Sequence, residues 1–156
     1  MRTLSATAIA AITRETTPEV FSWLIALSHA DMTTLYFTDN TETITSGGHD
    51  YIYYPFSFSP PEDKQQNTFS ATLSISNYNP VVVAALRALS SSPTITASMV
   101  LASEPDTALY GPVAFVVDSI DISQKTIAAK LKEKNVFMYS VPWTIYTAQA
   151  FPGLTQ

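Results

Sequence analysis

Several segments of this 156-residue chain show strict alternation of apolar and polar residues, which limits the folds that the chain can adopt. Residues 68–76 read TFSATLSIS, so that four apolar side chains from Phe69 to Ile75 share one face and hydroxyl side chains occupy the other. Residues 94–103, TITASMVLAS, alternate in the same way. A helix would require a period near 3.6, so this pattern predicts strands that each turn one face toward a core.

Similar segments on both sides of these two predict a mainly β fold. Residues 28–32 and 123–124 are short polar connections typical of hairpins, and Gly47 and Gly48 form a turn into an aromatic strand. We also expect a turn at residues 104–107, EPDT. The expected strands are residues 20–27, 33–39, 41–45, 51–58, 68–76, 94–103, 111–123 and 125–133.

Two short helices and one loop complete the expected arrangement. Ser5 is a typical N-cap for a helix over residues 5–14, and Asn79 with Pro80 is typical of the start of a helix between strands. Residues 59–67, SPPEDKQQN, predict a surface loop. The sequence shows no repeat and no linker. We expect a single domain over residues 1–156, divided into a helical arm (1–18), a β-core (19–134) and an extended tail (135–156).

The composition excludes several classes of protein. Only 13% of residues are charged, against roughly 25% in a typical soluble domain, which favours burial of surface in an assembly. The net charge is −5 and the eight Lys and Arg do not cluster, so direct nucleic-acid binding is not expected. The absence of cysteine excludes disulfides and thiolate metal sites. No apolar run approaches the roughly 18 residues that predict a membrane span, and the N-terminus is too weakly hydrophobic for a signal peptide.

The pair His49-Asp50 beside the two glycines is the first candidate for chemistry. A metal site needs three or four converging ligands, and nothing in the sequence brings His29 and Asp31 to this pair. Glycine and aspartate before a strand are typical of a turn. We therefore expect a turn here and assign no catalytic, cofactor-binding or metal-binding residue.

Other motifs also favour structural roles. No serine lies in a nucleophile elbow, and the four glycines do not form a phosphate-binding loop. The acids Glu62 and Asp63 fall in the polar loop, where solvated surface is expected. Asp118 and Asp121 alternate with apolar residues, which predicts a solvent-facing strand edge.

An aromatic set could in principle bind sugars or bases. Because no basic residues are interleaved with it, packing in the core or at an interface is the favoured interpretation. The set comprises Tyr51, Tyr53, Tyr54, Phe56 and Phe58.

The order of several segments resembles a family of phage minor tail proteins, a domain of unknown function found in tail modules of long-tailed phages. Its marks are ITSGGHDYIYYPF, then a polar loop, the strand ending in SISN, the short helix around ALRAL, the segment PTITASMVLASEPDTALYGPVAFVVDSIDIS and the closing FPGL. The resemblance covers about residues 20–154. The chain is also similar to the N-terminal part of the minor tail protein L of lambda-like phages, a tail-tip hub component.

This resemblance implies a tail-tube-like β-barrel or sandwich and a structural role at the tail tip or baseplate of the virion. It implies a ring, a trimer or hexamer, that joins the tail tube to hub or fibre proteins. Implied partners are other copies of the chain, the tail tube, the distal tail protein, the hub and the tape measure. The larger hub protein binds an iron–sulfur cluster through a cysteine-rich extension. This chain has no cysteine, so that cofactor is not carried over.

Two alternatives remain open from the sequence. One is a carbohydrate-binding β-sandwich that uses Trp23, Trp143 or the aromatic set as a stacking platform, and the other is a small hydrolase that uses His49 and Asp50. In the structural interpretation, both ends of the chain dock on neighbouring subunits, because one small domain does not bury all of their apolar residues. Those residues are Ile9, Ile12, Phe137, Trp143, Tyr146 and Phe151.

Overall fold

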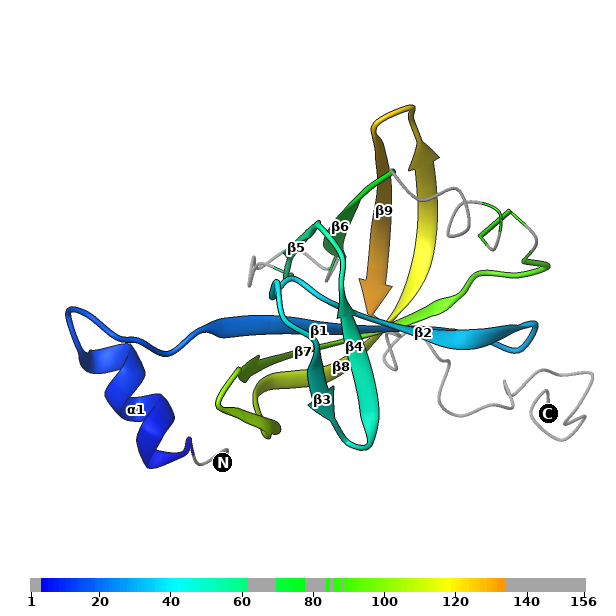
Figure 1. Ribbon diagram of the computed structural model, residues 1–156. Helices are drawn as coiled ribbons and strands as arrows, with labels where there is room; N and C mark the ends of the chain where they lie inside the picture. The colour runs from blue at the N-terminus through cyan, green and yellow to red at the C-terminus, as the bar shows by residue number, and fades with distance from the viewer. Residues whose placement is uncertain (1–3, 62–69, 78–83, 85, 88, 134–156) are drawn as a thin grey trace, which may run out of the picture.

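The computed structural model describes residues 4–61, 70–77, 84, 86–87 and 89–133, and most of these described residues lie in strands (Figure 1). The mainly β fold predicted from alternation is therefore confirmed. The elements are α1 (Ala6–Thr13), β1 (Phe21–His29), β2 (Met32–Thr38), β3 (Ile44–Ser46), β4 (His49–Tyr53), β5 (Phe56–Ser59), β6 (Ser70–Ser76), β7 (Thr94–Leu101), β8 (Glu104–Ile122) and β9 (Thr126–Glu133).

The described strands form one nine-stranded sheet with the order β3-β4-β2-β1-β7-β8-β9-β6-β5. Neighbours pair antiparallel, except that β2 and β4 run parallel over the two pairs Phe37–Ile52 and Thr38–Tyr53. The order has two ends, β3 and β5, so the described sheet is open. Of the two expected architectures, the sandwich is the better description and a closed barrel is not formed.

The core forms where the sheet folds over along β8. This 19-residue strand pairs with β7 through its first part and with β9 through its second. Inward side chains of β1 and β7, such as Ile25 and Ile95, therefore join one buried cluster with Leu73 of β6 and Leu131 of β9. Phe115 of β8 is fully buried in this cluster.

The alternating pattern gives the correct register for the clearest strand. Ala71, Leu73 and Ile75 of β6 are all buried, at 9% exposure or less, whereas Ser70 and Thr72 are exposed. Burial of Leu73 and of Ile75 stabilises the fold by about 1.5–3 kcal/mol each. A shift of one residue would turn all three into solvent, so burial fixes the pairing with β9.

The N-terminal helix forms where Ser5 predicts it. The Ser5 hydroxyl accepts a hydrogen bond from the Ala8 backbone N–H at 3.1 Å and so caps the first turn. The helix ends at Arg14, whose backbone is extended. Ala8 and Ala11 are buried, and the helix lies at one end of the molecule, beyond the start of β1 (Figure 1).

Some local expectations differ from the structure. Residues 104–107 are the start of β8, because the chain already turns at Ala102 and Ser103. The aromatic segment 51–58 is divided into β4 and β5, with Tyr54 and Pro55 between them.

Most of the helix expected at 80–89, most of the loop at 59–67 and the tail at 135–156 lie outside the described residues. The division into arm, core and tail stays a prediction.

Candidate interaction surfaces

The turn Gly47-Gly48 connects β3 to β4 as a two-residue hairpin loop, with Ser46 paired to His49. Both glycines have positive φ, +57° and +77°. These are the φ signs of a type I′ turn, which matches the twist of the flanking strands. The prediction of a turn at this motif is therefore confirmed.

His49 and Asp50 do not act together in the hairpin. Successive strand residues point to opposite faces of the sheet. The His49 ring stacks on Tyr36, with 4.4 Å between centroids and 12° between planes, and the Asp50 carboxylate accepts a hydrogen bond from the Thr45 hydroxyl at 2.7 Å. Among the described residues, no group of three or more histidine, aspartate or glutamate side chains gathers as a metal site.

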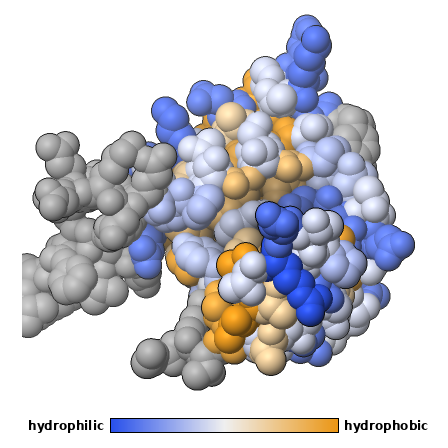
Figure 2. Space-filling model, turned by 90° about the vertical axis from the view of Figure 1, so that its left-hand side faces the viewer, coloured by the Kyte–Doolittle hydropathy of each residue, from blue (hydrophilic) through white to orange (hydrophobic). Residues whose placement is uncertain are grey.

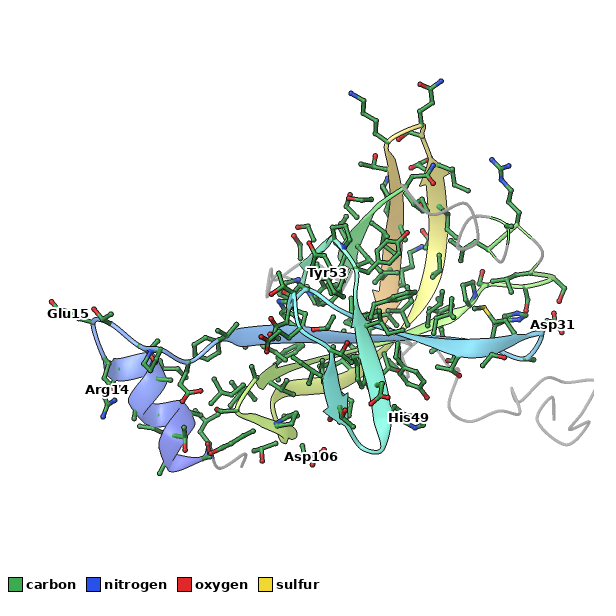
Figure 3. The ribbon with its side chains drawn as sticks, in the orientation of Figure 1. Arg14, Glu15, Asp31, His49, Tyr53 and Asp106 are labelled. Atoms are coloured by element: carbon green, nitrogen blue, oxygen red, sulfur yellow. The ribbon has the colours of Figure 1, made fainter. Side chains whose placement is uncertain are left out.

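The hairpin is tied to the beginning of β8, a contact that the sequence does not predict. The Ser46 hydroxyl donates to the Pro105 carbonyl at 2.7 Å, and the Gly47 backbone N–H donates to the Asp106 carboxylate at 2.9 Å. Figure 3 shows His49 and Asp106 at the same end of the molecule. The only indication of this contact in the sequence is Asp106, which lies in the segment 104–107 that was expected to be a turn.

The second histidine belongs to a different end of the fold. His29 is the last residue of β1 and Asp31 lies in the β1–β2 turn, with 3.6 Å between His29 Nδ1 and the Asp31 carboxylate. His29 Nε2 lies 2.7 Å from the Ser91 hydroxyl, and the Ser90 hydroxyl donates to Asp31 at 2.6 Å. Figure 3 places Asp31 far from His49. The structure therefore does not bring the two histidines together.

The aromatic set divides between the core and the surface. Tyr54 and Phe58 are buried, and Phe58 packs edge-on against Trp23 at 4.7 Å, which confirms packing for these members. Burial raises the pKa of the Tyr51 hydroxyl, with a smaller effect from Tyr36. Tyr53 is 42% exposed. Trp23 is thus part of the core and not a free platform, whereas Trp143 lies outside the described residues.

Asp39, which directly follows β2, holds the first part of β1 in place through a hydrogen bond. Its Oδ1 accepts a hydrogen bond from the Trp23 backbone N–H at 2.9 Å. Burial raises the pKa of this carboxyl, and the hydrogen bond from Trp23 opposes that rise. Sequence patterns gave no signal for this role, because the two residues meet only when β1 and β2 pair.

The two aspartates of β8 face solvent, as expected. Both Asp118 and Asp121 are exposed, and Asp118 forms an ion pair with Lys132 of β9 at 2.7 Å. β8 lies between β7 and β9, so the expectation that these residues mark a sheet edge is wrong. The exposed ion pair stabilises the fold by at most about 1 kcal/mol.

The outer surface of α1 is apolar. Ile9 is 50% exposed and Ile12 is 58% exposed, and these residues lie three positions apart on one side of the helix. Leu4, at 41%, and Val20, at 51%, add to the exposed apolar area at this end. Figure 2 shows a hydrophobic patch at the end of the molecule that carries α1. Leu4, Ile9, Ile12 and Val20 are referred to below as the arm surface.

The first turn of α1 lies beside the β7–β8 turn. The Thr7 hydroxyl and, less strongly, the Ser5 hydroxyl interact with the Glu104 carboxylate and lower the pKa of that carboxyl. Nearby, the Ala102 backbone N–H donates to the Val20 carbonyl at 2.9 Å. The helix is therefore positioned with its isoleucines outward.

No helix in the described part of the chain is long and apolar enough to cross a membrane. A scan of family models and a search of curated proteins each find no match. Among solved structures, the chain is similar to one from the virion of a native gene transfer agent particle, with a TM-score of 0.57 and 15% sequence identity. The similarity covers 91% of this chain and 49% of that chain, so this chain spans about half of the other's length. The two share a fold.

Proposed function

We propose that this chain is a structural subunit of a long-tailed phage virion, a minor tail protein at the tail tip or baseplate. The observation that carries the proposal is the fold shared with a chain of a virion particle over 91% of this chain. The order of the sequence motifs, which resembles phage minor tail proteins, supports the same role independently of the structural comparison.

The arm surface supports assembly as the mode of action. A helix that is apolar on both its inner and its outer side is usually buried on both. Ala8 and Ala11 on the inner side of α1 are buried, whereas Ile9 and Ile12 on its outer side are at least half exposed. A low content of charged residues, 13%, fits a protein whose flanks are covered by neighbours.

In this proposal the chain forms a ring, a trimer or a hexamer, that joins the tail tube to hub or fibre proteins. Its partners are other copies of itself and the adjoining tail tube, distal tail, hub and tape measure proteins. The net charge of −5 suits a ring through which DNA passes, since like charge prevents the phosphates from adhering. This role uses no catalytic residue, cofactor or metal.

Quantitative mass spectrometry of purified particles tests the proposal. A structural subunit is present at a fixed copy number relative to the tail-tube protein, and that ratio survives high-salt washing. The replacement Ile9→Glu with Ile12→Glu should remove the chain from particles while leaving its fold intact. Ala6→Glu is the matched control, because Ala6 is exposed on the same helix and a first-turn acid suits the helix dipole.

Absence of the chain from purified particles would contradict the proposal outright. Normal incorporation of the doubly charged variant would instead show that the arm surface is not an assembly contact.

A further inference from the structure

A hollow of about 350 Å³ opens on the surface where β4 leads into β5, at the lower end of the range for small-molecule sites. Its walls come from separate parts of the sequence: the end of β2, the β4–β5 junction, and β6. The sheet brings them together because Tyr53 pairs with Thr38 and Ser57 pairs with Ser74.

One wall of the hollow is aromatic. Tyr53 lines the hollow and is 42% exposed, so its side chain is accessible to a ligand. Phe56 is partly buried and packs against the main core, which holds its side chain in place. Rigid rings of this kind provide apolar contact at low cost in conformational entropy.

The opposite walls carry oxygen atoms. Ser57 and Ser74 are direct cross-strand neighbours, and Ser76 lies two residues further along the same face of β6. Within the described part of the chain, no hydrogen bond occupies these three hydroxyls, so each can both donate and accept. Asp39 adds a half-buried carboxylate whose position is fixed by the backbone N–H of Trp23.

We propose that this hollow binds a neutral pyranose, as a free sugar or as a residue of a glycan. A pyranose ring has an apolar face of C–H groups, which suits Tyr53, and a rim of hydroxyls, which suits the serines and Asp39. The carboxylate accepts hydrogen bonds from sugar hydroxyls and repels acidic sugars. This binding activity goes beyond the proposed virion role and does not depend on it.

The alternative to a ligand site is an ordinary solvated groove at the edge of a polar sheet face. Three features favour a site over a groove: the exposed ring beside a carboxylate, the fixed position of that carboxylate, and hydroxyls without partners in the described structure. None of the residues of the arm surface lines the hollow.

Saturation-transfer difference NMR on the full chain tests the proposal. The probes are glucose, galactose, mannose, N-acetylglucosamine and their β-linked and α-linked disaccharides, with glucuronic acid as the acidic comparison. At least one neutral sugar should receive saturation, strongest at the C–H protons of one ring face. Glucuronic acid should receive less.

Two variants locate the binding. Tyr53→Ala should weaken it by up to about tenfold, through loss of the ring contact. Asp39→Asn should weaken it by about tenfold, because a charged hydrogen bond becomes a neutral one. Ile52→Ala is the matched control, since Ile52 is 63% exposed on the neighbouring position of β4 and points to the other face. Circular dichroism confirms that each variant is folded.

Two results would overturn the inference: no saturation of any neutral sugar by the wild-type chain, or equal saturation by wild type and Tyr53→Ala. If Asp39→Asn fails to fold, Tyr53→Ala still decides, because its side chain is exposed. Failure of sugar binding leaves the particle copy number unaffected, so the two proposals fail separately.

Discussion

The Gly47 backbone N–H donates a hydrogen bond to the Asp106 carboxylate at 2.9 Å, although the two residues lie 59 positions apart in the sequence. This contact, with the neighbouring one from Ser46 to Pro105, fastens the β3–β4 hairpin to the start of β8. The motif that looks most like an active-site loop in the sequence is thus a turn at a junction between two parts of the sheet.

Gly48 should tolerate only residues that accept a left-handed backbone. Its φ is +77°, and a built Cβ meets no atom within 4 Å, so backbone strain alone decides the outcome. Gly48→Val should lower the free energy of unfolding by about 1–2 kcal/mol, whereas Gly48→Asn should lose less because asparagine adopts positive φ more readily. Urea unfolding measures both. Equal unfolding midpoints for the two variants would show that the positive φ of Gly48 does not affect the stability of the hairpin.

His49 should be dispensable for assembly. Its ring stacks on Tyr36 at an exposed position, and such a pair contributes about 0.5–1.5 kcal/mol. His49→Ala should therefore give a small loss of thermal stability and normal particle yield, with His49→Phe close to wild type. Stoichiometric metal in the purified wild-type chain, or loss of infectivity in a folded His49→Ala variant, would contradict this expectation.

Leu73 and Thr72 test the register of β6. Leu73 is 1% exposed, and Leu73→Asp would bury an unpaired charge; this costs several kcal/mol, enough to unfold a domain stable by about 5–15 kcal/mol. Thr72→Asp places the same charge on the exposed face, opposite Lys130. That variant should fold with a midpoint close to wild type in chemical denaturation. A similar loss of stability in both variants would mean that the register of β6 on β9 is assigned wrongly.

The docking of α1 should depend on pH through Glu104. Hydrogen bonds from Thr7 and Ser5 favour the carboxylate, so its folded pKa lies below its unfolded value. The stabilisation is then complete above the unfolded pKa, about 4.3 for glutamate, and is lost as the pH falls through the folded pKa. Hydrogen exchange of the α1 amides, corrected for the intrinsic pH effect, should show less protection in acid. Glu104→Gln should lower the protection of the α1 amides at pH 7 and remove this pH dependence. If the pH profile of the variant equals that of the wild type, Glu104 does not stabilise the docking of α1.

Much of the fold could be predicted because burial on one face leaves a mark of period two. Leu73, Ile95 and Ile127 all lie in the core where alternation places them. The N-terminal helix could be predicted because its cap is local, with Ser5 and Ala8 three positions apart. Both kinds of signal are short-range, and they are visible without knowledge of the neighbouring strands.

The contacts that shape the surfaces could not be predicted in this way. The bond from Trp23 to Asp39 and the bond from Gly47 to Asp106 each join segments that meet only through strand order. Residues 104–107 read as a turn because proline and aspartate favour turns, but the chain reverses two residues earlier and this segment pairs with β7. The hollow proposed to bind a sugar is likewise made by three segments, of which only the aromatic one was noticeable in the sequence.

A cryo-EM reconstruction of purified particles would show whether this chain is a ring subunit of the tail tip. We expect density for this chain at the tail tip, in a closed ring of identical subunits, with Ile9 and Ile12 of each copy buried against a neighbouring chain. Particles whose tail tip lacks this sheet, or a sheet in place with its α1 isoleucines facing solvent, would contradict the proposed role.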